Sequence, residues 1–154
     1  MSDAALRLLV FRVGNLVCAA EVDRVREILP RLAPTRVPGA PPAVAGLINV
    51  RGTLVTVVDG WRALNQPVPV GNGGASTILL EVSRPGGSGG SGRRVIGLVV
   101  DEVMDLLAVG RDALEPRQAL PGLDPTLVRA VGRRGGTLFV VLDPDSLLAP
   151  MLSA

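Results

Sequence analysis

The stretch that decides the fold is residues 44–59, VAGLINVRGTLVTVVD. Its two apolar arms predict two strands joined at residues 49–53, with Arg51 in the connection. Near the C-terminus, residues 136–143 (GTLFVVLD) repeat the character of residues 52–59 position by position. This echo predicts a doubled small β unit, and the arginine in only one copy indicates that the two halves differ in role.

Short apolar runs between turn residues predict further strands along the chain. Gly14-Asn15 is a tight-turn pair between two such runs, which should form a hairpin. The expected strands are residues 6–13, 16–22, 44–50, 54–58, 77–82, 95–100, 101–109 and 138–142. Short helical segments are expected at the end of residues 23–29 and at residues 61–64, 124–131 and 144–148. The prolines of residues 30–42 predict an ordered loop.

Two units of about five short strands each should form two small barrels. Such barrels enclose few side chains, so they gain from burying apolar faces against each other, at about 25 cal/mol per Å² removed from water. We therefore expect one domain over residues 5–150, with a first lobe at about 15–76 and a second lobe in the remainder. Glycine at residues 71–74 predicts flexibility. The Gly/Ser tract at 84–94 predicts a flexible hairpin loop, either natural or engineered.

Composition narrows the class of protein. Hydrophobic residues make up 47% of the 154 residues and charged residues 19%, which predicts a folded chain. Aromatic residues are 2%, and histidine, lysine and tyrosine are absent, so all sixteen basic side chains are arginine. These arginines are scattered, the net charge is only +2 and few rings are present for stacking. Nucleic-acid binding is therefore a poor hypothesis.

The sequence contains no arrangement of side chains that predicts catalysis. Cys18 is the single cysteine and lies in an apolar run, which favours a small buried hydrophobe over a reactive thiol. The lack of histidine excludes a zinc site with nitrogen and sulfur ligands, and the patterns of calcium and phosphate loops are missing. Asp101 and Glu102 should point to opposite faces of a strand at a solvated edge. We expect no enzyme activity, no metal and no cofactor.

Targeting signals are missing as well. The N-terminus has no basic segment before an apolar one, which argues against a secretory signal. Acidic residues interrupt the apolar runs well before the length of a membrane span. These features predict a cytoplasmic protein.

Several of these segments together resemble the CheW family of bacterial chemotaxis coupling proteins. The most specific is GLINVRG at residues 46–52, preceded by VREI at 25–28 and followed by weaker matches at 55–59, 96–103 and 138–148. In this order the resemblance covers residues 6–148. It implies a mainly β fold of two intertwined five-stranded SH3-like β-barrels with short helices, in agreement with the doubled unit.

The resemblance implies a non-catalytic adaptor without a cofactor. Such proteins couple the cytoplasmic tips of methyl-accepting chemoreceptors to the regulatory domain of a CheA-type histidine kinase, which has the same fold. The expected location is the cytoplasm, in membrane-associated or cytoplasmic receptor arrays, without insertion into the membrane and without nucleic acid. The receptor, the kinase and the output of the pathway are left open. The alternative is a small β-barrel domain that binds nucleic acid or a small molecule.

One ion pair follows from the residues and the resemblance together. Arg51 follows an apolar strand, where its guanidinium must be solvated or paired, and the family pattern places Glu27 nearby. We predict that they meet and hold the loop of a receptor-facing groove; alternatively, the pair only pins one barrel together. The candidate receptor- and kinase-binding residues are Val25, Glu27, Gly46, Asn49, Val50, Arg51, Gly52, Val99 and Val103.

Some of these candidates have a structural alternative. Gly46 and Gly52 should permit close backbone approach or a positive φ, and each candidate valine can equally be a core residue. Trp61, the only tryptophan, either caps the first barrel or anchors a partner. Thr56 and the corner at residues 60–62 depart from the family pattern, so partner choice can differ from that of a motility system.

Overall fold

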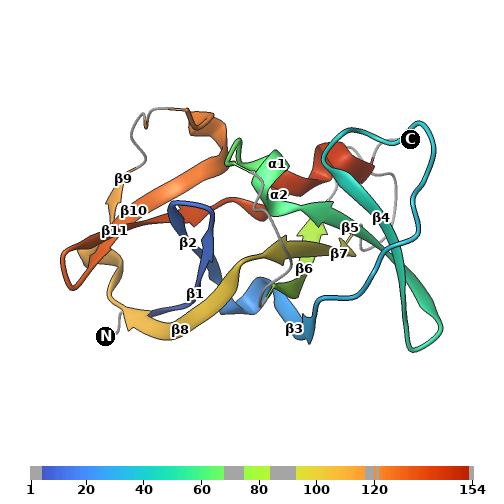
Figure 1. Cartoon of the computed structure of the whole chain (residues 1–154). Helices are drawn as coiled ribbons and strands as arrows, with labels where there is room; N and C mark the ends of the chain where they lie inside the picture. Colours follow the sequence, from blue (N-terminus) through green and yellow to red (C-terminus); the bar gives the residue numbers. More distant parts are fainter. Residues whose placement is uncertain (1–4, 68–74, 84–92, 117–119, 121, 153–154) are drawn as a thin grey trace.

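A computed structural model shows a molecule built mainly of strands (Figure 1). It describes residues 5–67, 75–83, 93–116, 120 and 122–152. The stretches expected to be flexible at 71–74 and 84–92 lie outside the described residues. Residues 93 and 94, which the sequence assigns to the Gly/Ser loop, already belong to a strand.

Eleven strands and two short α-helices follow one another in the described residues. The strands are β1 (Leu6–Val13), β2 (Leu16–Glu21), β3 (Val25–Pro30), β4 (Val44–Val50), β5 (Thr53–Asp59), β6 (Ser76–Ser83), β7 (Arg93–Val100), β8 (Glu102–Val109), β9 (Glu115–Pro116), β10 (Val128–Arg134) and β11 (Thr137–Leu142). The helices are α1 (Gly60–Ala63) and α2 (Pro144–Leu148), and the 3-10 turns are η1 (Val22–Arg24), η2 (Arg111–Ala113), η3 (Pro125–Leu127) and η4 (Ala149–Leu152). Each expected strand is present, with ends that agree or differ by one or two residues.

The strands form two sheets that exchange hairpins between the halves of the chain. Sheet A has the order β8-β1-β2-β11-β10-β9, in which β9 is only two residues long, and sheet B has the order β3-β6-β7-β5-β4. The β1–β2 hairpin therefore lies among strands of the second half, and the β6–β7 hairpin lies among strands of the first half (Figure 1). The two barrels are intertwined, as expected. A lobe boundary near residue 76, however, does not follow the sheets.

The strand pairing reproduces the repeat seen in the sequence. β5 runs parallel to β7, and β11 runs parallel to β2, whereas the other strand pairs in the two sheets are antiparallel. Val57 lies opposite Gly97 in sheet B, and Val141 lies opposite Ala19 in sheet A. Each Gly-Thr-Leu strand is thus completed by the hairpin from the other half. Neither half can therefore close its sheet alone.

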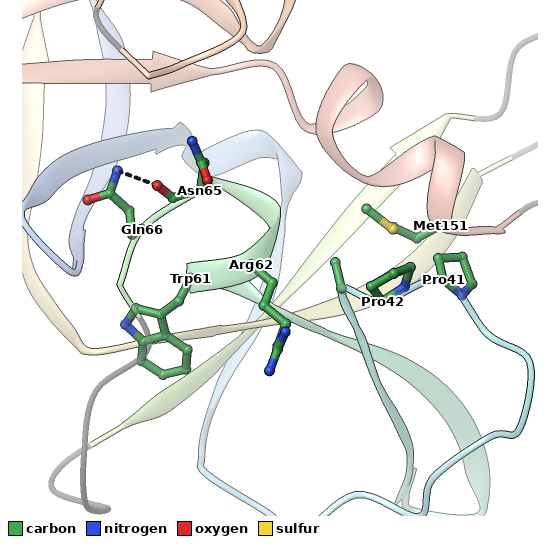
Figure 2. Close-up of a pocket in the computed structure, with 8 residues that line it drawn as sticks. Pro41, Pro42, Trp61, Arg62, Asn65, Gln66 and Met151 are labelled. Carbon is green, nitrogen blue, oxygen red and sulfur yellow. Dashed lines mark hydrogen bonds between the residues drawn. The ribbon is translucent and has the colours of Figure 1, made fainter.

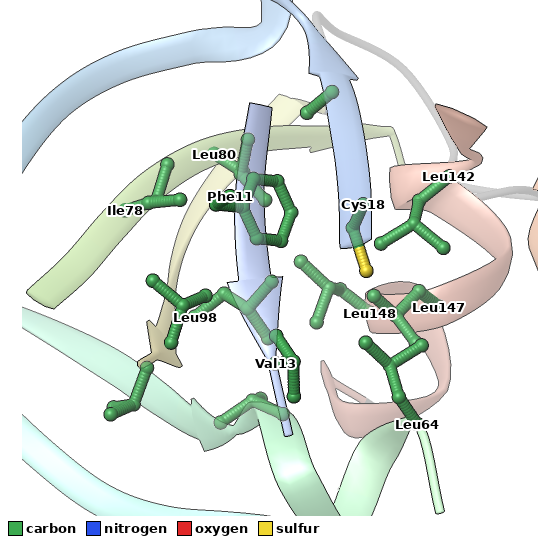
Figure 3. Close-up of a cluster of buried hydrophobic side chains, with 14 of the residues drawn as sticks. Phe11, Val13, Cys18, Leu64, Ile78, Leu80, Leu98, Leu142, Leu147 and Leu148 are labelled. Atoms are coloured by element: carbon green, nitrogen blue, oxygen red, sulfur yellow. The ribbon is translucent and has the colours of Figure 1, made fainter. Parts of the chain in front are cut away.

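One large hydrophobic cluster lies between the sheets (Figure 3). β1 contributes Leu9, Phe11 and Val13 to it, whereas the alternate residues Leu8 and Val10 belong to a second, smaller cluster with side chains of β2 and β11. A strand that is buried on both faces must be apolar at consecutive positions. This requirement explains why the sequence of β1 is nearly continuous in apolar residues.

Cys18 on β2 points into the same large cluster (Figure 3). Its side chain is fully buried, and burial raises the pKa of the thiol, so the sulfur stays protonated. The structure therefore confirms the prediction of a small buried hydrophobe.

The acid at the end of each repeat caps a helix. Asp59 ends β5, and its Oδ1 accepts a hydrogen bond from the Trp61 N–H at 3.0 Å, at the start of α1. Asp143 follows β11, and its Oδ1 accepts from the Asp145 N–H at 3.1 Å, at the start of α2. Asp124 caps η3 in the same manner. The capping role explains why the Gly-Thr-Leu strand is followed by aspartate in both copies.

A helix over residues 124–131 is wrong. Only Pro125–Leu127 forms a 3-10 turn, and β10 follows it directly. A register shift between Val128 and Ala130 brings Val128 and Val131 to buried positions three residues apart. A β-bulge therefore produces the apolar spacing that the sequence analysis assigns to a helix.

A helical segment at the end of residues 23–29 is also wrong. η1 comes first, and β3 follows from Val25 to Pro30. Side chains of β3 alternate between half-buried and exposed positions, so that Ile28 is exposed and Leu29 packs on the core. The adjacent apolar residues therefore face opposite sides of a strand and do not mark one side of a helix.

Two short crossovers carry the chain from one sheet to the other. They are η1, between β2 and β3, and Asp101, between β7 and β8. Arg24 ties the first crossover to α2, because its Nη1 and Nη2 donate to Oδ1 and Oδ2 of Asp145 at 2.9 Å each. Asp145 also accepts a hydrogen bond from the Ser83 N–H at 2.7 Å. The Arg24 guanidinium lowers the pKa of Asp145 below its ordinary value.

Replacing Asp145 by asparagine should lower the free energy of unfolding by about 1–3 kcal/mol near neutral pH, because a partly buried guanidinium loses its charged partner. The folded pKa of Asp145 lies below its ordinary value of 3.8. Its stabilising effect is therefore present above about pH 4 and is lost as the pH falls through the folded pKa. Urea unfolding at several pH values should show a difference between the two proteins that shrinks in acid. The exposed Asp112→Asn variant is the control, and a pH-independent difference would argue against an ionic contribution.

Candidate functional site

The contact expected between Glu27 and Arg51 is present. Arg51 Nη1 donates to Glu27 Oε2 at 3.1 Å, and Nη2 donates to Oε1. Glu27 lies on β3 and Arg51 follows β4, and these strands are the two ends of sheet B. The ion pair therefore closes the seam where the first and last strands of the sheet meet. It lowers the pKa of Glu27, with the hydrogen bond from Arg51 as the main cause.

The turn that carries Arg51 has a defined geometry. Arg51 has φ +49° and Gly52 has φ +87°, so both residues are in the left-handed region that glycine adopts readily. Asn49 Oδ1 accepts a hydrogen bond from the Gly52 N–H at 2.8 Å and fixes the turn. Arg51 thus projects from a tight turn into solvent, with 70% of its side chain exposed.

Gly46 has a different role, near the start of β4 and away from this turn. It has φ +149°, and a Cβ atom there would lie 2.2 Å from the carbonyl oxygen of Thr35. The missing side chain lets the proline-containing loop approach β4, where Thr35 and Leu47 exchange backbone hydrogen bonds at 2.8 Å. Gly46 therefore shapes the loop, and nothing places it against Arg51.

The seam of sheet B is also an open groove. Its volume is about 500 Å³, and Glu27, Val50 and Arg51 line it together with Arg26, Thr53, Val55, Leu79 and Val95. Two apolar side chains on the strands that border the groove are exposed to solvent, Ile28 on β3 and Leu54 on β5, the latter by 65%. Neither side chain lines the groove itself. This part of sheet B nevertheless presents exposed hydrophobic area on the strands that border a surface ion pair, the composition of a protein-docking surface.

Sheet A has a second seam, between its end strand β8 and β10, which only the two-residue β9 follows in the sheet; the sequence analysis missed this seam. Arg134 Nη2 at the end of β10 donates to Asp105 Oδ2 on β8 at 2.7 Å. Leu106 on β8 and Leu138 on β11 are exposed beside it, Leu106 by 60%. The expectation of an arginine in only one copy is therefore wrong.

The register of the repeat explains why this second pair was missed. Val50 pairs with Thr53 before the first turn, and Arg134 pairs with Thr137 before the second. The second arginine thus stands one position earlier than Arg51 and at the end of its strand. Alignment of Glu27 with Asp105, both preceded by a valine two residues earlier, is the signal that could have found it.

Three predicted partner residues lie away from the seams. Val25 and Val103 are half-buried and pack against the large central cluster, and Val99 is buried. Val25 is paired with Leu80 on β6, and Val103 is paired with Phe11 on β1. These valines therefore lie beside the crossovers at the junction of the two sheets. Their binding role stays a prediction.

Of the two acids expected at a solvated strand edge, only Glu102 lies there, on the edge strand β8 with 55% of its side chain exposed. Asp101 lies in a bend before β8, only 14% of its side chain is exposed, and its Oδ2 accepts from the Gly14 N–H at 2.6 Å and from Trp61 Nε1 at 2.8 Å. Arg12 lies between the two acids, 3.6 Å from Asp101 Oδ2 and 3.2 Å from Glu102 Oε1. The bend breaks the alternation of a strand, so both acids reach one guanidinium.

A second groove lies beside α1 (Figure 2). Its volume is about 480 Å³, and it is lined by Pro41, Pro42, Ala43, Trp61, Arg62, Asn65, Gln66 and Met151. Trp61 is only 5% exposed and belongs to the central cluster. The structure thus favours the capping role of Trp61 over an exposed anchor.

Neither a metal-binding cluster nor a membrane helix is found in the part of the chain that the structure describes. No group of three or more histidine, cysteine, aspartate or glutamate side chains is placed there to hold a metal ion. The described helices are all too short, or too polar, to cross a bilayer.

Comparison with known proteins gives a consistent picture. The family model of the CheW-like domain matches residues 7–150. The chain is 27% identical over 148 residues to the chemotaxis protein CheW of Rhizobium meliloti, which covers 96% of this chain and 90% of that protein. It is 27% identical over 145 residues to the chemotaxis protein CheW of Bacillus subtilis, covering 92% and 86% of the two chains.

A solved structure has the same fold. The crystal structure of the scaffolding protein TtCheW from Thermoanaerobacter tengcongensis matches with a TM-score of 0.81. The match covers 94% of this chain and 92% of the other, at 19% sequence identity. Agreement at this level of identity concerns the fold.

Removal of the Arg51 guanidinium should raise the pKa of Glu27 toward its ordinary value of 4.5, because the hydrogen bond from Arg51 is the main cause of its lowering. Carboxyl-carbon NMR titration of the wild type and of Arg51→Ala would measure this shift. Arg62→Ala, which removes an arginine that pairs with Asp59, is the matched control and should leave Glu27 unchanged. Equal Glu27 pKa values in the wild type and Arg51→Ala would mean that the pair does not persist in solution.

Proposed function

We propose that this chain, which belongs to the CheW-like domain family, is a non-catalytic adaptor that couples chemoreceptors to a CheA-type histidine kinase in a signalling array. The family match over residues 7–150 carries this conclusion. It favours the adaptor over a domain that binds nucleic acid or a small molecule. The adaptor works in the cytoplasm, at the tips of membrane or cytoplasmic receptors, and needs no cofactor.

The two seams are the surfaces on which the regulatory domain of the kinase docks. Each seam joins an acid–arginine pair to exposed aliphatic side chains, Ile28 and Leu54 at one end and Leu106 and Leu138 at the other. The charges in each pair satisfy one another, so a partner needs to supply mainly apolar surface. A regulatory domain with the same fold has corresponding seams, which supports seam-to-seam contact.

The receptor tip binds at the junction of the sheets. Val25 and Val103 occupy corresponding places at the starts of β3 and β8, and both are half-buried against the central cluster. An apolar side chain from a receptor helix would cover the part of these valines that is still exposed. Glu27, Val50 and Arg51 at the seam and Asn49 and Gly52 in its turn are assigned to the kinase-facing surface, in place of the receptor-facing groove expected from the sequence, because the seam is separate from the junction that holds Val25 and Val103.

Substitution of the exposed leucines should separate docking from folding. Leu54→Asp and Leu106→Asp place a charge in the two apolar surfaces and should weaken binding of the purified kinase regulatory domain by tenfold or more. Because both side chains are largely exposed, thermal unfolding should stay close to that of the wild type. Calorimetric titration with the kinase regulatory domain measures the effect, and the wild type is expected to bind with a Kd of about micromolar.

The control is Leu32→Asp, which adds the same charge to an exposed leucine in the loop after β3. It should bind the regulatory domain as the wild type does. Normal binding by both seam variants would contradict seam-to-seam docking. A well-folded wild type that forms no complex with any kinase regulatory domain or receptor fragment of the same genome would contradict the adaptor function itself.

A further inference from the structure

We propose that Asp101 is a positioning residue that couples the receptor-facing junction to helix α1 through the indole of Trp61. This inference rests on the proposed function, because it assigns the receptor tip to the junction beside Val103. It adds a structural coupling. Binding of the receptor at the junction changes the environment of Trp61, and weakening of the contact between Asp101 and Trp61 weakens receptor binding.

Asp101 is the single residue between a strand of sheet B and a strand of sheet A. β7 ends at Val100 in sheet B, and β8 begins at Glu102 in sheet A. The backbone N–H of Asp101 donates to the Arg12 carbonyl oxygen at 2.9 Å. The direction in which β8 leaves β7, and with it the position of Val103, therefore depends on how Asp101 is held.

One carboxylate oxygen of Asp101 joins both sides of the junction. Oδ2 accepts from the Gly14 N–H, in the β1–β2 turn of sheet A, at 2.6 Å. The same atom accepts from Trp61 Nε1, on α1, which follows β5 of sheet B, at 2.8 Å. With 14% of the side chain exposed, water competes weakly for these hydrogen bonds. A shift of one sheet against the other must therefore move the indole or break one of the bonds.

The helix side of this connection is rigidly packed. A Cβ atom at Gly60 would lie 2.4 Å from the Val99 carbonyl oxygen, so α1 rests directly on the end of β7. Trp61 is buried, and its indole nitrogen points away from Arg62 and Met151 in the groove beside α1 (Figure 2). The indole thus faces Asp101 and is well placed to report movement of the crossover.

The other crossover provides an internal comparison. Asp23 in η1 precedes Val25 by the same number of residues as Asp101 precedes Val103, yet Asp23 is exposed. There the crossover is held by Arg24 and Asp145 on α2. Each crossover therefore contacts a helix through side-chain hydrogen bonds, but only the crossover at Asp101 does so through a buried indole.

The experiment compares Asp101→Asn, Trp61→Phe and the control Asp23→Asn with the wild type. Each folded protein is titrated with a purified receptor cytoplasmic fragment and, separately, with the kinase regulatory domain. Asp101→Asn and Trp61→Phe should bind the receptor fragment about tenfold more weakly, the effect of losing one charge-assisted hydrogen bond. Their affinity for the kinase domain, which docks at the seams, should be unchanged, and Asp23→Asn should match the wild type in both titrations.

The fluorescence emission of Trp61 tests the coupling directly, because it should not change on receptor binding if Asp101 and Trp61 have a purely structural role. The receptor fragment should shift the emission of the wild-type protein, whereas the kinase domain should not; this requires fragments without tryptophan. This measurement needs no substitution, so it tests the inference even if Asp101→Asn fails to fold.

The outcomes separate the two proposals. A receptor fragment that binds the wild type without shifting Trp61 emission, or that binds Asp101→Asn and Trp61→Phe as tightly as the wild type, would overturn the coupling and leave the adaptor function standing. A wild type that binds neither fragment would refute the proposed function first. Equal loss of receptor and kinase binding in Asp101→Asn would indicate general distortion and would also overturn a specific positioning role.

Discussion

The exchange of hairpins between the two sheets is the constraint on which the rest of this structure depends. Because β1–β2 completes a sheet made mostly by the second half, and β6–β7 completes the sheet of the first half, each half lacks an essential part when alone. The large cluster between the sheets contains residues of both hairpins. Folding should therefore be cooperative over both sheets, and their relative orientation is set by the short crossovers at η1 and Asp101.

The same arrangement leaves a seam in each barrel that backbone pairing does not close. Glu27 with Arg51 joins the two ends of sheet B through side chains, and Asp105 with Arg134 joins the end strand β8 of sheet A to β10. Exposed ion pairs of this kind contribute little to stability. The seams are therefore places where apolar side chains can stay exposed beside satisfied charges, which suits a protein whose function is to be bound by others.

The chemistry of the chain agrees with an adaptor. Its cysteine is buried and protonated, and Asp101 at the junction acts as a hydrogen-bond acceptor for a backbone N–H and an indole N–H. Under the proposed function, the partners use three surfaces: the two seams and the junction between the sheets. An array needs such separate surfaces, because receptor and kinase must be held at the same time.

The sequence by itself determined most of the strands, the doubled unit and the burial of Cys18, because alternation, turn residues and a repeated motif are local properties. The Glu27–Arg51 contact was predicted only with the family resemblance, because it joins residues at opposite ends of a sheet. The sequence did not determine which strands share a sheet, since pairing between distant strands leaves no periodicity in the chain. For the same reason it missed Arg134, which meets Asp105 only when β8 and β10 of sheet A come together. It also misread Asp101 as solvated and residues 124–131 as a helix. A bend and a bulge change the direction of side chains there, and only the packing of the two sheets decides where they occur.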